Sequence, residues 1–176
     1  TGQVVDVIVT NANGCQATST GITNTVNSLP TPTLTSSDAD NTFCSGTSVT
    51  FTAGGGTSYN FRVGGASVQN GTSATYTTSA LINGQGVDVI VTNSNGCTAT
   101  SSGIINIVRD LPTPTLTSSD GDNTFCIGTS VTFTAGGGTS YNFRVNGTSV
   151  QSGASPTYTT STLPNGQIVS VIVTNS

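Results

Sequence analysis

Apolar and polar residues alternate over short stretches of this chain, and the apolar positions do not recur at helical spacing. In Ser48–Ala53 every second residue is apolar and the others carry hydroxyl groups. Ser58–Val63 repeats the alternation with aromatic residues. Such a period of two places the apolar side chains on one face, as in a half-buried β-strand. The same reasoning predicts strands at 32–36, 75–81, 87–93 and 97–108.

Glycine and asparagine separate these segments. They form the turn signals Gly54-Gly55-Gly56, Gly64-Gly65 and Asn95-Gly96, because both residue types tolerate the positive φ that tight turns require. The chain therefore has six to seven short strands, rich in Thr and Val, in each unit of about 80 residues. This arrangement predicts an all-β fold of antiparallel β-sandwiches, of immunoglobulin-like or PKD-like type.

The whole pattern returns after 82 residues. When the sequence is shifted by that period, 74 of 94 aligned positions are identical. We expect a complete repeat at 29–110, the final strands of a truncated repeat at 1–28, and a repeat without its last strand at 111–176. Near-identical copies are typical of arrays that extend by adding units. Leu-Pro-Thr-Pro at 29–32 and 111–114 predicts short, semi-rigid joints, because proline fixes φ and favours extended backbone.

Charge and composition exclude several classes of function. Three arginines are the only basic residues, the net charge is −4, and His, Lys and Glu are absent. Nucleic acid is not an expected partner, because phosphate binding needs clustered cations. Without His, Lys or Glu the chain also lacks a general base beyond a few aspartates, so we do not expect an enzyme. No segment approaches the length of apolar sequence that crosses a membrane.

The motifs FCxGxSVTFTA, SYNFRV and VxVIVTNxNGC together resemble the Ig-like repeats of very large surface proteins of Bacteroidetes. That family includes gliding-motility adhesins and other proteins exported by type IX secretion. The similarity covers the whole repeat, twice. The tryptophan usual in the aromatic strand is replaced by Phe61 and Phe143.

The resemblance implies an extracellular, cell-surface location and a structural role. On this hypothesis the repeats are spacers in the stalk of a long adhesin, active in cell adhesion or gliding motility, and neighbouring repeats of the same chain are their partners. The alternative is a repeated module that binds a glycan or surface polymer and gains affinity by repetition. Sugar sites usually expose aromatic side chains, whereas Tyr59, Phe61 and Tyr76 fall on the predicted core faces.

Each period contains two cysteines, at Cys15, Cys44, Cys97 and Cys126. The resemblance and the even count favour a disulfide between Cys44 and Cys97, with the partners of Cys15 and Cys126 outside this sequence. In an immunoglobulin order of strands, however, Cys44 and Cys97 would lie at opposite ends of the sandwich. In that case Cys44 would meet only the corresponding cysteine of the following repeat. A metal site of cysteines is not expected, because there is no CxxC and no histidine.

Two further groups of polar residues are candidates for a site. Asp38 and Asp40 recur as Asp120 and Asp122, and alternate carboxylates can bind Ca²⁺. We prefer to interpret them as turn formers, because one loop offers about three of the six to eight oxygen ligands that Ca²⁺ takes. No other cofactor is expected. Arg62 is expected to pair with Asp88 across neighbouring strands, a pair that the next copy lacks because Ser170 replaces the aspartate.

Overall fold

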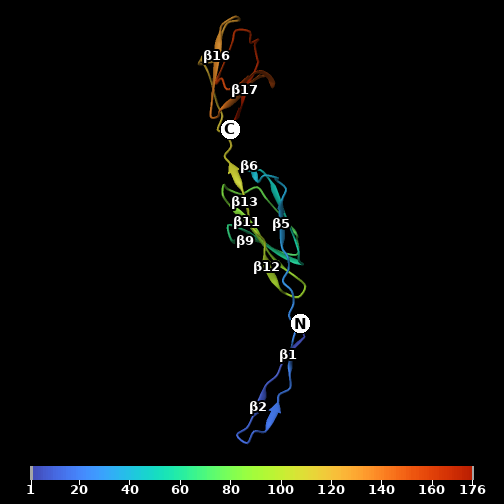
Figure 1. The fold of residues 1–176 in the computed structure, drawn as a ribbon. Helices are drawn as coiled ribbons and strands as arrows, with labels where there is room; N and C mark the ends of the chain where they lie inside the picture. Colours follow the sequence, from blue (N-terminus) through green and yellow to red (C-terminus); the bar gives the residue numbers. More distant parts are fainter. Residues whose placement is uncertain (1, 176) are drawn as a thin grey trace. The chain divides into compact units, whose positions relative to one another are not determined.

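The computed structural model describes residues 2–175, in which every regular element is a β-strand (Figure 1). The chain divides into two compact units, one ending at Arg109 and the other beginning at Asp110. No helix in the described part of the chain is long and apolar enough to cross a membrane.

Residues 29–109 of the first unit form a sandwich of two antiparallel sheets. In one sheet the order is β10 (Thr75–Thr78), β7 (Val49–Gly54), β5 (Thr33–Ser36). In the other the order is β12 (Thr98–Thr100), β11 (Gly86–Thr92), β8 (Ser58–Val63), β9 (Ala66–Gly71), and β13 (Ile104–Ile105) pairs with β11 as well. The predicted all-β sandwich is confirmed.

The alternating apolar residues of β7, β8 and β11 build one core between the two sheets. Phe51 and Phe61 have no exposed surface, and neither do Val87, Val89 and Val91 along β11. The ring of Tyr76, on β10, lies 5.8 Å from that of Phe61 and 6.5 Å from that of Phe51. Period-two alternation therefore located the central strands correctly, because each has one face in this core.

The predicted strands were incomplete. β6 (Thr42–Cys44) and β9 were not predicted; residues Ala66–Gly71 of β9 lack apolar alternation but follow the Gly64-Gly65 turn and pair with β8. The single strand predicted at 97–108 is interrupted, and its residues form β12, β13 and β14 (Ile107–Arg109).

The last of these strands, β14, pairs with a strand near the start of the repeat. β14 lies parallel to β6 (Thr42–Cys44), with Arg109 opposite Cys44. Phe43 and Val108 at this junction belong to the core and are each 8% exposed. The segment after β13 therefore closes one end of the sandwich.

The second unit reproduces the central strands of both sheets. One sheet has the order β15 (Thr115–Ser118), β16 (Val131–Gly136), β19 (Thr157–Thr160), and the other β18 (Thr148–Gly153), β17 (Ser140–Val145), β20 (Val169–Thr174). The registers match those of the first copy, including a bulge between Phe143 and Arg144 that corresponds to the one between Phe61 and Arg62. Repetition of sequence thus becomes repetition of structure.

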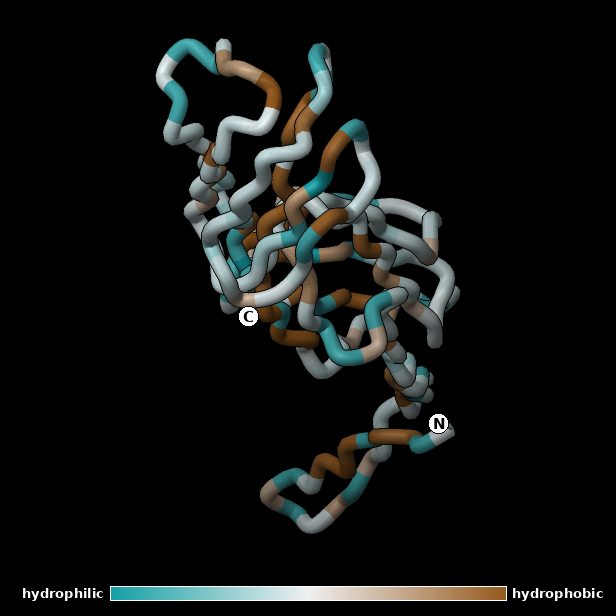
Figure 2. Tube along the Cα trace, turned by 90° about the horizontal axis from the view of Figure 1, so that it is seen from above, coloured by the Kyte–Doolittle hydropathy of each residue, from teal (hydrophilic) through white to brown (hydrophobic). Residues whose placement is uncertain are grey.

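The first residues of the chain form a hairpin. β1 (Gln3–Val5) pairs with β4 (Ile22–Asn24), and β2 (Ile8–Thr10) pairs with β3 (Gln16–Thr18). This is the register in which β11 pairs with β13 and β12, shifted by 82 residues. Apolar colouring follows the first arm of the hairpin in Figure 2, and its valines and isoleucines are 57–68% exposed. We refer to residues 2–28 as the N-terminal hairpin.

The triple glycine after β7 has a packing role as well as a turn role. A Cβ at Gly55, whose φ is +94°, would overlap the carbonyl oxygen of Thr31. A Cβ at Gly56 would overlap Val91. The backbone of the proline-rich joint therefore lies directly against this turn, which requires glycine.

Candidate functional site: a groove in the second unit

A groove of about 640 Å³ lies in the second unit. Its apolar lining comes from both sheets and from the loops beside them, and includes Leu116, Phe125, Phe133, Leu163 and Val169. Phe133 is 8% exposed and the other four are partly buried. An open depression lined about equally by polar and apolar surface can hold aliphatic side chains beside polar groups.

Polar residues also line the groove. They include Thr117, Ser118 and Thr124, together with Asn123 and the turn Asn165–Gln167. No charged residue is among the lining residues. The groove therefore offers hydrogen bonds to a peptide backbone or a neutral polar group beside apolar side chains, and no carboxylate or cationic side chain is among its lining residues.

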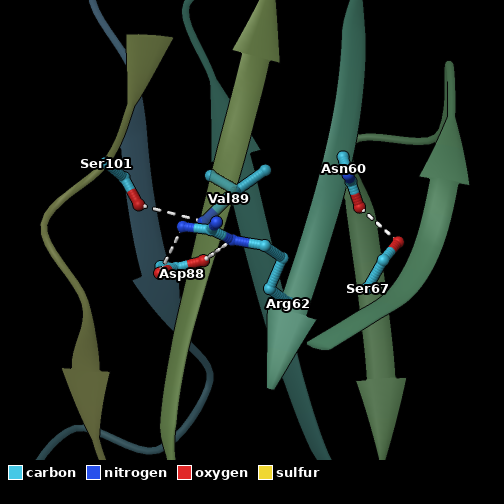
Figure 3. A network of polar contacts seen from close by, with 6 residues as sticks. All are labelled: Asn60, Arg62, Ser67, Asp88, Val89 and Ser101. Carbon is cyan, nitrogen blue, oxygen red and sulfur yellow. Dashed lines mark hydrogen bonds and ion pairs between the residues drawn. The ribbon is translucent and has the colours of Figure 1, made fainter. Parts of the chain in front are cut away.

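Arg62 and Asp88 form the predicted pair in the first unit (Figure 3). Nε and Nη2 of Arg62 donate hydrogen bonds of 2.7 and 2.8 Å to the two carboxylate oxygens of Asp88. The pKa of Arg62 is raised above its ordinary value, chiefly by the hydrogen bond to Asp88 and also by the attraction of its charge. In the second unit Arg144 faces Ser170 instead.

The other contacts in Figure 3 serve the sheet itself. Ser101 follows β12, where regular pairing with β11 stops, and its Oγ accepts a hydrogen bond of 3.2 Å from the amide of Val89. Ser67 Oγ and Asn60 Oδ1 lie 2.6 Å apart across β8 and β9. Polar side chains here complete backbone pairing or join strands, which is a structural task.

The structure does not bring Cys44 and Cys97 together. Cys97 closes the turn after β11, where its carbonyl accepts a bond from Asn93, whereas Cys44 lies opposite Arg109, beyond the start of β11. The seven residues of β11 separate the two positions by roughly 20 Å at about 3.3 Å per residue. Disulfide bonds require Cα atoms within about 7 Å.

The disulfide predicted within the repeat is therefore not formed in this structure. All four cysteines are free thiols, and Cys15 and Cys126 are exposed like Cys44. The alternative, a bond from Cys44 to the following repeat, concerns a cysteine outside this sequence and stays a prediction.

The aspartate side chains of the two loops accept hydrogen bonds from backbone amides of the same loop. Oδ1 of Asp38 and Oδ1 of Asp40 both accept a hydrogen bond of 3.0 Å from the amide of Thr42. Asp120 and Asp122 hold the amide of Thr124 in the same way. These contacts are those of turn-forming aspartates. Among residues 2–175 no three His, Cys, Asp or Glu side chains gather as for a metal ion, and calcium binding stays an untested prediction.

All ten aromatic residues are buried or partly buried. The tyrosines on the central strands also have internal partners for their hydroxyls: Tyr59 donates to the carbonyl of Gly56 at 2.7 Å, and Tyr141 to that of Gly138 at 2.6 Å. No described aromatic side chain therefore forms an exposed platform for stacking against a sugar ring.

The groove was not predicted from the sequence. A signal for it was present in the repeat itself, because the positions that follow β11 in the first copy have no counterparts among residues 111–175. Recognising their importance required knowing that β13 and β14 return to close the sandwich.

No known protein family matches the chain, and no curated protein matches it. Among solved structures, the chain is similar to the fibronectin(III)-like modules of Clostridium thermocellum CbhA, with 18% sequence identity and a TM-score of 0.45. The match covers 80% of this chain and 84% of that one.

Proposed function

We propose that these repeats are structural spacers in the stalk of a long, secreted, cell-surface adhesin that serves cell adhesion or gliding motility. Each sandwich would lengthen the stalk and project a distal binding region from the cell. The partners of each repeat are then its neighbours in the same chain. This proposal draws on the resemblance of the repeat motifs to those of large surface proteins.

One observation carries the proposal: in both copies the aromatic residues of the repeat motif are packed inside the sandwich. Phe61 and Phe143, at the same place in the two copies, have no exposed surface. The described polar contacts of the loops and sheets are mostly to backbone atoms of the same unit. A glycan-binding module would instead present aromatic and polar groups together on its surface.

Scattering measurements on proteins with increasing numbers of repeats test the proposal. If the proline-containing joints at 29–32 and 111–114 are semi-rigid, the largest dimension should grow almost linearly with repeat number. Growth with the square root of repeat number would indicate freely jointed beads, and the spacer hypothesis would lose its mechanical basis. Strong binding of this chain on a glycan array would favour the binding-module alternative.

A further inference from the structure

The last residues of the N-terminal hairpin lie against a turn of the first sandwich. The side-chain amide of Asn93 donates a hydrogen bond of 2.9 Å to the carbonyl of Ser28, and Sγ of Cys97 lies 4.0 Å from the carbonyl oxygen of Asn27. Asn93 and Cys97 belong to one turn, because Oδ1 of Asn93 accepts hydrogen bonds from the amides of Asn95 and Cys97, each of 3.0 Å. The turn that carries Cys97 is therefore fixed against the end of the preceding repeat.

The repeat period shows which cysteine of the preceding repeat belongs at the same point. Asn27 has the repeat position of Arg109, 82 residues later. In the first copy Arg109 lies opposite Cys44 in the parallel pairing of β14 with β6, and the amide of Ser45 donates to the carbonyl of Arg109 at 2.8 Å. Paired strands lie about 4.7–4.9 Å apart. A cysteine at the position of Cys44 in the preceding repeat would thus lie beside Asn27, the residue that Cys97 approaches.

The two cysteines of a repeat are placed at its two joints. Cys97 lies beside the residues that precede the joint at 29–32, and Cys44 lies beside Arg109, which precedes the joint at 111–114. Cys44 is exposed and Cys97 is only partly buried. A free cysteine is ordinarily among the most buried residue types. The exposure of both thiols, each next to a neighbouring repeat, points to partners outside their own sandwich.

We propose that successive repeats are joined by a disulfide between the cysteine at the position of Cys44 in one repeat and the cysteine at the position of Cys97 in the next. In the first complete repeat, Cys97 bonds to the preceding repeat and Cys44 to the following one. The two thiols lose two protons and two electrons when the S–S bond forms. A disulfide-containing oxidant accepts them by exchange and is itself reduced to two thiols.

This inference deepens the spacer role and rests on it, because it needs repeats that follow one another in one chain and an oxidising location outside the cell. Each joint then has two covalent connections, the proline-containing backbone and the S–S bond. Tension that pulls two sandwiches apart is carried by both. The bond also accounts for two cysteines in a repeat whose own sandwich brings them nowhere near each other.

A chain with one complete joint tests the proposal. The sequence of residues 95–110 is appended after residue 176, so that the second repeat is completed by the sequence of the first and gains a cysteine at the position of Cys97. After oxidation with glutathione disulfide, peptide mass spectrometry of the monomeric fraction without reductant should find Cys44 linked to the added cysteine. A bond from Cys44 to Cys97, a bond from Cys126 to the added cysteine, or a Cys44 thiol left free or capped by glutathione would overturn the proposal.

A matched pair of serine variants separates a specific bond from chance oxidation. Cys44→Ser should abolish the cross-link, whereas Cys126→Ser removes an equally exposed cysteine at the same repeat position and should leave the yield unchanged. In a glutathione redox buffer, the effective concentration of the two thiols should be at least about tenfold higher in the folded chain than in urea, because an unfolded segment only tethers them. Equal values in buffer and urea, or equal effects of the two serine variants, would contradict a bond fixed by the joint.

Scattering keeps this test apart from that of the spacer role. In multi-repeat chains with every cysteine replaced by serine, linear growth would support the spacer role whether or not the cross-link forms. Square-root growth in the oxidised chains that contain their cysteines would remove the spacer role even where mass spectrometry finds the bond.

Discussion

The two copies of the repeat share most of their residues, yet their cores are closed to different degrees. Val87 and Val89 of β11 have no exposed surface, whereas their counterparts Val169 and Val171 are only partly buried. The strands that carry them pair with β8 and β17 in the same register. The difference comes from β13 and β14, which cover this end of the first copy and have no counterparts in the described part of the second.

One short segment shows the effect of context most directly. Thr-Phe-Cys occurs at 42–44 and again at 124–126. The first copy is strand β6, paired with β14, and the second is not in a strand. Phe43 is 8% exposed, whereas Phe125 is partly buried at the edge of the groove. Identical residues thus adopt a strand only where a partner more than 60 residues later in the chain is present, so tertiary pairing decides over local propensity.

The largest difference between the copies should appear when a core phenylalanine is truncated. Phe51→Ala removes a side chain with no exposed surface and should lower the stability of the first unit by about 3–5 kcal/mol. Phe133→Ala removes its counterpart, which lines the groove, so less packing is lost and the decrease should be smaller. Peptide-resolved hydrogen exchange in the intact chain reports the two units separately.

The control for this comparison is a second pair of phenylalanines. Phe61 and Phe143 are both fully buried, so replacement of either by alanine should cost its own unit a similar amount. If Phe51→Ala and Phe133→Ala also gave equal losses, the open groove would not weaken packing around it.

A buried asparagine should give an intermediate effect. Asn106→Ala removes the side-chain bonds to Gln85 and Ile104 and should destabilise the first unit by about 1–3 kcal/mol. Asn24 occupies the same repeat position in the N-terminal hairpin but is exposed. Asn24→Ala should therefore change stability by about 0.5 kcal/mol or less. Hydrogen exchange of the amides in β11 and in β1 measures the change in stability that each substitution causes. Equal effects at the two positions would mean that burial does not distinguish them.

Central parts of the fold could be predicted from the sequence because their signals are local. The alternation in β7, β8 and β11 gave the inward faces, and the register that places Arg62 beside Asp88 followed from strand order. The carboxylates of Asp38 and Asp120 accept hydrogen bonds from nearby amides, contacts that depend only on adjacent residues.

The parts that could not be predicted depend on contacts between distant segments. β6 has strand form only beside β14, and β9 is fixed by its pairing with β8 and not by alternation. The cysteine pairing was favoured by an even count, but the length of β11 between Cys44 and Cys97 separates them. The groove is likewise visible only once the path of residues 104–109 in the first copy is known.

The smallest expected difference concerns the one ion pair that distinguishes the copies. Asp88→Ser should make the first unit resemble the second at this position, and Ser170→Asp should give Arg144 the partner that it lacks, because the registers of the two strand pairs are the same. The pair lies on the solvent face, where water and salt screen it, so each substitution should shift the thermal midpoint only slightly and in opposite directions. Both shifts should vanish in concentrated salt. If instead Asp88→Ser destabilised its unit as strongly as Asn106→Ala, or if its effect persisted in concentrated salt, the pair would have to be fixing the register of β8 and β11. The absence of an aspartate at 170 would then be a second reason, besides the open groove, for the looser core of the second copy.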